Sequence, residues 1–106
     1  MELTTLEQHL LLAIVALHPN AYGVSIQELI KDRIGREPST GSVYASLDRL
    51  EEKGFVKSRQ GEATAERGGK RKLYFTVTAS GQHALRQSLQ AIQSLSHGLR
   101  WKGAAI

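Results

Sequence analysis

The sequence predicts a mainly α-helical fold with one small β-hairpin, because helical and strand-like patterns follow each other in a fixed order. Four segments repeat their apolar residues at helical spacing, and each begins near a Ser or Thr that can cap a helix. Two short segments, residues 55–60 and 72–77, are strand-like. The 106 residues have the usual length of one domain. The expected order is helix, helix, helix, strand, loop, strand, helix.

The first expected helix begins near Thr4 or Thr5 and ends before Pro19, which cannot continue a helix. Thr4 with Glu7, and Thr5 with Gln8, both fit a capping box. The apolar residues cover more than one stripe, which predicts burial on two sides, one against the chain's own core and the other against a second chain. They are Leu3, Leu6, Leu10, Leu11, Leu12, Ala13, Ile14, Val15 and Leu17.

The next two expected helices are joined by a short turn. Ser25, with Glu28 three residues later, fits the start of the second helix, and Gly35 fits its C-cap. Ser39 or Thr40 then caps the third helix. The residues of the third helix expected to face the core are Val43, Leu47 and Leu50, and those expected on its outer side are Ser42, Ala45, Ser46 and Arg49.

The net positive charge of the chain comes from one segment. Residues 53–72 contain seven Lys or Arg and two Glu, a net charge of +5, whereas the rest of the chain has a net charge of −1. The seven basic residues are Lys53, Lys57, Arg59, Arg67, Lys70, Arg71 and Lys72. Such a basic patch on a nearly neutral body favours a polyanion as partner. A solvated loop that maintains solubility is the alternative interpretation.

A last helix is expected to begin after Thr78, near Ala79, and Gly98 could end it. At about 1.5 Å per residue it would be roughly 30 Å long, more than so small a domain can cover. Its seven-residue apolar repeat therefore predicts contact with a second chain. With the first helix, this gives the expected dimer interface, Leu3, Leu6, Leu10, Leu85, Leu89, Ile92 and Leu99. The predicted units are residues 1–80, the helix 81–100 and a tail 101–106.

Several classes of function are not favoured by the sequence. No apolar run approaches the length of a membrane span, and the acidic, polar start does not resemble a secretory signal. There is no cysteine, and the four histidines lack metal-binding spacing. No nucleophile has a base at a recognisable spacing. We therefore expect a cytoplasmic protein without catalytic activity, metal or cofactor.

The element order indicates a winged helix-turn-helix that binds DNA. The start of the third helix, Ser39, Thr40, Gly41 and Ser42, combines small side chains with free amides, which suits an anion or a groove. Ser46 and Arg49 are expected to point outward toward bases or phosphates. The hairpin would act as a wing and place Arg67, Lys70, Arg71 and Lys72 near the DNA backbone or minor groove. Core packing, a solvated polar face or a protein–protein interface are the alternatives for these same elements.

Three segments resemble the PadR family of bacterial transcriptional regulators. They are "AYGVSIQELI", "STGSVYASLDRLEEKGFV" and "RGGKRKLYFTVTASG", and the resemblance covers about residues 6–85. It implies a homodimeric winged helix-turn-helix, usually a repressor, in which the first and last helices form the dimer. Two recognition helices about 34 Å apart would then bind a palindromic site in double-stranded DNA. Thr40 departs from the family, whose members often have Pro there, and the short C-terminal region resembles the subfamily with a single C-terminal helix.

Three individual residues allow more than one interpretation. Tyr44 is expected to pack its ring at the edge of the core and to present its hydroxyl near DNA. Arg49 is either a DNA contact or an ordinary surface residue beside Asp48 and Glu52. Trp101 could stack a planar aromatic effector between subunits, close the dimer as an apolar plug, or lie in a frayed tail. A winged-helix module that binds another protein remains the rival to a DNA-binding regulator.

Overall fold

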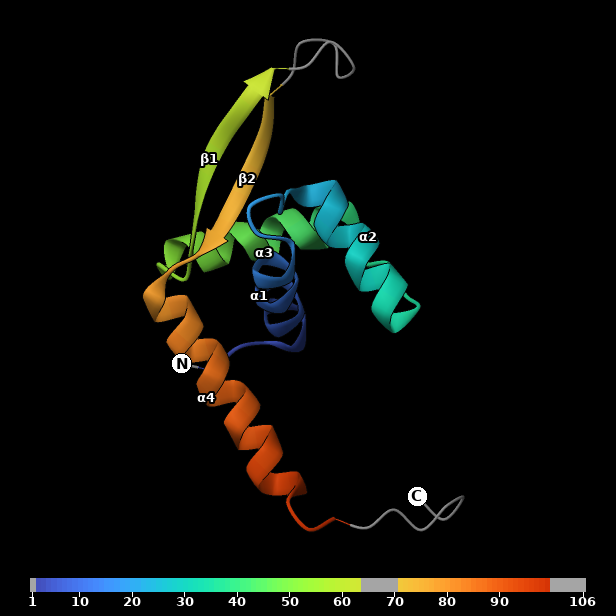
Figure 1. The fold of residues 1–106 in the computed structure, drawn as a ribbon, viewed down its shortest axis with the longest axis vertical. Helices are drawn as coiled ribbons and strands as arrows, with labels where there is room; N and C mark the ends of the chain where they lie inside the picture. Colours follow the sequence, from blue (N-terminus) through green and yellow to red (C-terminus); the bar gives the residue numbers. More distant parts are fainter. Residues whose placement is uncertain (1, 64–70, 100–106) are drawn as a thin grey trace.

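A computed structural model describes residues 2–63 and 71–99, and its elements follow the predicted order (Figure 1). Over these residues the fold is mainly α-helical with one antiparallel β-hairpin, as predicted. The elements are α1 (Thr5–Leu17), α2 (Gly23–Ile34), α3 (Thr40–Glu52), β1 (Val56–Ala63), β2 (Arg71–Val77) and α4 (Ala79–Ser96).

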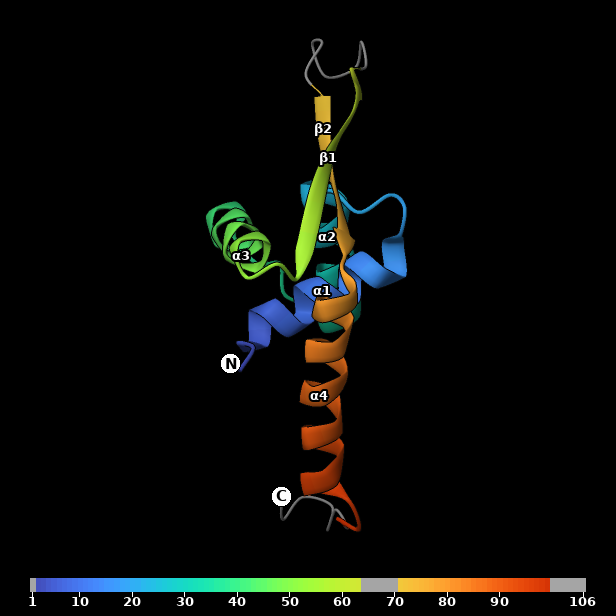
Figure 2. The same ribbon diagram turned by 90° about the vertical axis from the view of Figure 1, so that its left-hand side faces the viewer.

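The three N-terminal helices form the body, and the other elements project from it. The hairpin extends from one end of this body and α4 extends from the opposite end, so the two lie along the long axis of the molecule (Figures 1 and 2). Helix α1 crosses the centre and contacts α2, α3, α4 and β2. The body thus holds the hairpin and α4 through one shared helix.

One apolar core joins all six elements. Leu10, Leu11 and Ile14 of α1 are completely buried, and each such side chain contributes about 1.5–3 kcal/mol on transfer from water. The other buried apolar residues are Leu3, Ala13, Ala21, Ile26, Ile30, Val43, Leu47, Leu50, Val56, Phe75, Val77 and Leu85. The core-facing residues predicted for α3 are confirmed.

Of the first two helix starts, one was predicted correctly and the other was not. Thr4 and Glu7 form the predicted capping box, with the Glu7 amide donating to Thr4 Oγ1 at 3.1 Å and the Thr4 amide donating to Glu7 Oε1 at 2.8 Å. Helix α2 begins at Gly23, earlier than predicted, with Tyr22 as its N-cap. Ser25 lies in the first turn, where its Oγ accepts from the Tyr22 amide (2.9 Å) and donates to the Asn20 carbonyl (2.8 Å).

The hairpin is anchored to the body along both strands. Val56 pairs with Val77 and Gln60 with Leu73, and β1 continues to Ala63, beyond the predicted strand 55–60. On its other side, β2 donates a hydrogen bond from the Phe75 amide to the carbonyl of Ala21, at 2.8 Å. The segment before α2 therefore lies beside β2 almost as a third strand.

Helix α4 is fixed only at its N-terminal end. Thr78 caps it as predicted, accepting from the Gly81 amide at 3.1 Å, and Thr78 Oγ1 also donates to the Gly54 carbonyl at 2.6 Å. Within this helix only Gly81 and Leu85 are buried. Its 18 residues span about 27 Å, so the distal part stands free of the body.

Candidate nucleic-acid interface

The start of α3 is an exposed turn made of small residues. Ser39 caps the helix, with its Oγ accepting from the Ser42 amide at 3.2 Å and donating to Ser42 Oγ at 2.8 Å. The first bond of the helical series is from the Val43 amide to the Ser39 carbonyl, at 3.0 Å, so the amides of Thr40 and Gly41 precede that series. A Cβ added at Gly41 would meet no atom within 4 Å, which means that an approaching backbone could come close here.

The turn between α2 and α3 is held by a glutamine that the sequence analysis did not single out. Gln27 is 8% exposed, and its Nε2 donates to the carbonyl of Pro38 and to Oγ1 of Thr40, each at 3.1 Å. These bonds fix the start of α3 relative to α2. A polar residue between the apolar Ile26 and Ile30 on a buried face was the signal in the sequence that could have identified it.

Ser46 does not lie on the outer face of α3, and that prediction was wrong. Its side chain is 1% exposed, because it lies on the same face as Val43 and Leu50, about one turn before and after it, and next to the buried Leu47. Its Oγ accepts a hydrogen bond from Nη2 of Arg49 at 2.9 Å. Ser46 thus supports the exposed Arg49 from beneath and offers no surface of its own.

Tyr44 covers the start of α2. It is 42% exposed, and a Cβ placed on Gly23 would be 2.1 Å from Tyr44 Oη and 2.6 Å from its Cζ. Gly23 therefore leaves the space that the phenol ring occupies. The ring lies against Gly23 and its hydroxyl lies at the N-terminus of α2, while the predicted contact of this hydroxyl with DNA stays a prediction.

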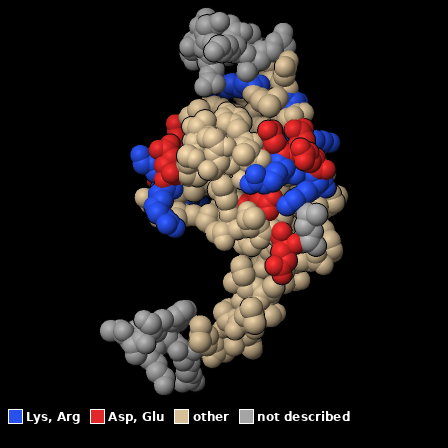
Figure 3. Space-filling view, turned by 180° about the vertical axis from the view of Figure 1, so that it is seen from behind, with Lys and Arg blue, Asp and Glu red and all other residues tan. Residues whose placement is uncertain are grey.

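The basic residues of the wing fall into three groups. Arg67 and Lys70 lie outside the described residues, and Arg71 begins β2, with its side chain not described. Lys72 has its Nζ 4.2 Å from the centre of the Tyr22 ring, and Arg59 of β1 has its Cζ 4.9 Å from the centre of the Tyr74 ring. Lys and Arg side chains are visible beside the hairpin in Figure 3.

The residues predicted for the dimer interface divide into a buried and an exposed set. Leu3, Leu10 and Leu85 are 8%, 0% and 6% exposed and pack inside their own chain, so assigning them to a second chain was wrong. Leu6 is half-buried at the edge of the same core. The predicted residues Leu89, Ile92 and Leu99 are exposed along and just beyond α4, and so is Leu95, which was not among the predicted interface residues. Arg86 is the one charged residue of α4, and its distal part is uncharged in Figure 3.

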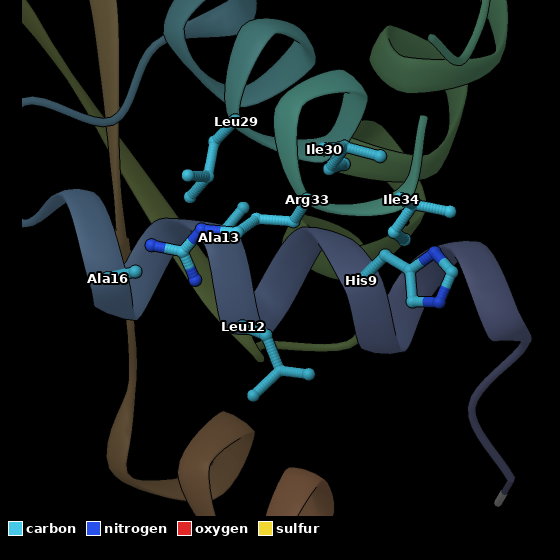
Figure 4. Close-up of a pocket in the computed structure, with 8 residues that line it drawn as sticks. All are labelled: His9, Leu12, Ala13, Ala16, Leu29, Ile30, Arg33 and Ile34. Carbon is cyan, nitrogen blue, oxygen red and sulfur yellow. The ribbon is translucent and has the colours of Figure 1, made fainter. Parts of the chain in front are cut away.

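A second apolar surface lies between α1 and α2, where a pocket of about 470 Å³ opens (Figure 4). Four residues from each helix line it: His9, Leu12, Ala13 and Ala16 from α1, and Leu29, Ile30, Arg33 and Ile34 from α2. Leu12 points away from α2, and the Arg33 side chain lies along α1 (Figure 4). Trp101, the predicted effector contact, lies outside the described residues.

Neither a candidate metal site nor a candidate membrane span is present in the described ranges, 2–63 and 71–99. There, no three His, Cys, Asp or Glu side chains gather in a way that could hold a metal ion. In the same ranges, no helix combines the length and apolar character needed to cross a membrane.

The sequence profile of the transcriptional regulator PadR-like family matches residues 11–87, from α1 into α4. The chain belongs to the PadR-like family. No curated protein matches it. Among solved structures, this PadR-like protein is similar to a transcriptional regulator from Clostridium thermocellum, with 22% identity, a TM-score of 0.72, and coverage of 85% of this chain and 84% of the other.

Two further structures share the fold of this PadR-like protein. One is a PadR-like transcriptional regulator from Bacillus cereus, with 21% identity, a TM-score of 0.70, and coverage of 86% of this chain and 84% of the other. The other is Bacillus subtilis PadR in complex with operator DNA, with 21% identity, a TM-score of 0.66, and coverage of 81% and 48%. The winged-helix architecture predicted from the sequence is thus that of known PadR regulators.

Proposed function

We propose that this PadR-like protein is a homodimeric regulator that binds double-stranded operator DNA through α3. The observation that carries this proposal is the exposed start of α3, where the amides of Thr40 and Gly41 lie beside the small side chains of Ser39 and Ser42. A helix N-terminus attracts phosphate, and a major groove about 12 Å wide accepts a helix. The operator complex of the related B. subtilis PadR supports the proposal.

The contacts of the wing and of α3 have different roles in this proposal. Arg67, Lys70 and Arg71, at and next to the connection between β1 and β2, approach the phosphate backbone beside the groove that α3 enters. Arg49 lies three turns into α3 and reaches either a phosphate or a base edge. Phosphate contacts position the protein, whereas base contacts give sequence preference.

The exposed apolar surface of α4 supports the homodimer. Ile92 and Leu95 are 53% and 89% exposed, on a helix with a single charge. Exposed apolar surface of this kind is costly in water and typical of protein interfaces. Two copies would place their α3 helices about 34 Å apart, which matches a palindromic site with half-sites one DNA turn apart.

The regulatory outcome is proposed from the family. Repression in the cytoplasm, with release by a small molecule, is the behaviour that we expect of this PadR-like protein. A planar aromatic compound that stacks on Trp101 is the candidate effector. Binding of such a compound would raise the melting temperature of the wild type and not of Trp101→Ala.

Substitution of Ser42 by Glu tests the proposal without harming the helix. Ser39 followed by Glu three residues later would form a capping box, so the folded state should be as stable as the wild type or more so. The added charge faces the DNA phosphates, so the affinity for a duplex from the protein's own upstream region should fall more than tenfold. A mobility shift with competitor DNA measures this fall.

Ala79→Glu is the matched control, because it adds the same charge to the exposed first turn of α4. Its affinity for the duplex should stay close to that of the wild type. Equal losses for both variants would indicate a general charge effect and remove α3 from the interface. A wild-type protein that binds no duplex at low salt, but captures a protein partner, would favour a winged-helix protein-binding module instead.

A further inference from the structure

Two tyrosines and two cations form a cluster where the hairpin meets the body. The residues are Tyr22, the N-cap of α2; Arg59 of β1; and Lys72 and Tyr74 of β2. We name this group the wing-base cluster. It joins the segment before the helix-turn-helix to both strands of the wing, although the sequence separates its members by up to about fifty residues.

In the wing-base cluster the two rings contact each other, and each ring also contacts one cation. The Tyr22 and Tyr74 rings meet edge to face, with centroids 5.6 Å apart and planes at 72°. Lys72 Nζ lies over the Tyr22 ring, and the Arg59 guanidinium lies over the Tyr74 ring. Each cation is therefore placed against a π face, where it is attracted by the ring quadrupole.

Backbone contacts tie the same cluster to the body. Arg59 Nη2 donates to the carbonyl of Pro19 at 3.4 Å, and the Phe75 amide donates to the carbonyl of Ala21 at 2.8 Å. The segment that receives these two bonds leads directly into Tyr22. The orientation of the hairpin is thus coupled to the segment that starts α2, and α2 holds the start of α3 through Gln27.

Gly61 of β1 provides the space for one of the rings. A Cβ at this position would lie 2.3 Å from Cε2 of Tyr74 and 2.9 Å from its Cδ2. The Tyr74 ring therefore occupies the space beside Gly61, and the guanidinium of Arg59, two residues before Gly61 on β1, lies over this ring. A larger residue than glycine at position 61 would prevent the ring from taking this position.

We propose that the four members of the wing-base cluster are positioning residues, which set the angle of the wing relative to α3. In this proposal Lys72 and Arg59 act through the tyrosine rings and are not phosphate ligands. This differs from the role expected for Lys72 from the sequence, where it belonged to the block of wing cations. The first test of this proposal measures DNA binding and therefore rests on the proposed function. The second test uses the protein alone and does not depend on that function.

The first test is a double-mutant cycle of Tyr22→Leu and Lys72→Gln in DNA binding. Each single variant should weaken binding about three- to tenfold, because Lys72→Gln removes the contact of the cation with the Tyr22 ring, and Tyr22→Leu removes this contact together with the contact between the two rings. The double variant should be no weaker than the weaker single variant. A phosphate-bound Lys72 would instead give losses that multiply, and Lys72→Gln alone would reduce the salt slope by about one. That result would overturn the proposal.

Lys57→Gln is the matched control for this cycle. Lys57 is an exposed cation on β1, two residues from Arg59. The loss of affinity caused by Lys57→Gln should multiply with the loss caused by Tyr22→Leu, since the free-energy changes of independent sites add. Tyr22→Phe keeps the ring and should bind close to the wild type. If Tyr22→Phe lost as much affinity as Tyr22→Leu, the aromatic ring would not be the cause of the loss, and the proposal would be overturned.

The second test needs no DNA. Hydrogen exchange of the Phe75 amide reports directly on the bond to Ala21, and Tyr22→Leu should accelerate it at least about tenfold relative to the Val43 amide inside the body. Unchanged exchange at Phe75 would overturn the coupling. If the wild type bound no DNA at all, the proposed function would fail, while this exchange measurement would still decide whether the cluster orients the hairpin.

Discussion

At the scale of single residues, two glycines are required by close contacts rather than by backbone angles. A Cβ at Gly81 would lie 2.1 Å from the carbonyl oxygen of Phe55 and 2.8 Å from Cγ1 of Val77. A Cβ at Gly23 would meet the end of the Tyr44 side chain. The carbonyl of Phe55 cannot move without displacing the backbone that leads into β1, whereas the half-exposed phenol ring of Tyr44 can swing aside.

Gly81→Ala should therefore destabilise the fold by about 1–3 kcal/mol, in spite of the better helix propensity of Ala. Gly41→Ala is the matched change, because the space around its Cβ is empty. It should raise the free energy of unfolding by up to about 1 kcal/mol. Urea denaturation measures both changes. Equal effects at the two positions would contradict the close contact at the start of α4.

Residue-scale prediction from sequence succeeded where the signal is local. The Thr4–Glu7 capping box and the Thr78 cap depend on residues three apart, and both were predicted. Ser46 was misjudged and Gln27 was missed, because both are polar residues among the buried apolar residues of their helices and only the packing of these helices shows that they are buried. The same holds for Leu10, whose apolar face was attributed to a second chain.

At the scale of elements, a buried ion pair joins the start of α1 to the end of α3. Glu7 Oε2 accepts from Lys53 Nζ at 2.8 Å, with the Glu7 side chain 0% and the Lys53 side chain 21% exposed. Burial alone would raise the pKa of Glu7, but the hydrogen bonds from Lys53 and from the Thr4 amide hold the pKa below its ordinary value. The pair thus fixes the C-terminal end of α3 next to the wing.

The lowered pKa of Glu7 predicts an acid-dependent loss of stability. A carboxyl group with a pKa lower in the folded state than in the unfolded state stabilises the fold fully above its unfolded pKa of about 4.3, and this contribution disappears as the pH falls through the folded value. The free energy of unfolding of the wild type should therefore fall below about pH 4.3 more steeply than that of Glu7→Gln. Parallel pH curves for the two proteins, measured by urea denaturation, would contradict this.

The two partners of the pair should respond unequally to substitution. Lys53→Met leaves a buried carboxylate without its cation and should cost about 3–5 kcal/mol at neutral pH. Glu7→Gln leaves a lysine that can turn toward water and should cost about 1–3 kcal/mol. Glu52→Gln, at an exposed position next to Lys53, is the control and should change stability by less than about 0.5 kcal/mol. The reverse order would show that Glu7 is not the buried partner.

Element order was predicted fully, and element ends less well. The α2 start at Gly23 was missed because its N-cap is Tyr22, a residue type outside the usual capping set. The extension of β1 to Ala63 was missed because glycine and charge in this segment resemble a loop. Both places are in contact with a distant element, since Tyr44 packs on Gly23 and Tyr74 packs on Gly61. Such contacts cannot be recognised from the neighbouring residues in the sequence.

At the scale of the whole molecule, the shape suggests how two copies would assemble. The wing and α4 point in opposite directions from the body (Figures 1 and 2), so contact through α4 leaves both wings and both α3 starts free. The surface that would drive this contact is the exposed set on and beyond α4. The pocket between α1 and α2 is lined by residues of these two helices and by none of the residues proposed to contact DNA (Figure 4).

Ile92→Glu combined with Leu95→Glu should abolish the proposed dimer. Burying two charges in an apolar interface costs far more free energy than these two positions contribute to association. Both positions are exposed in the single chain, so the fold should be retained. Light scattering after gel filtration should give a monomer mass for this variant and a dimer mass for the wild type and for the control Gln90→Glu. A dimeric double variant would remove α4 from the interface.

The salt dependence of DNA binding by the wild-type protein tests the central claim most directly. Each phosphate contact releases counterions and contributes about −0.9 to the slope of log affinity against log salt concentration. For two wings and two α3 starts we expect a slope between about −4 and −10, with specific binding to one upstream palindrome. Absence of binding at low salt, or a slope near zero, would contradict the account.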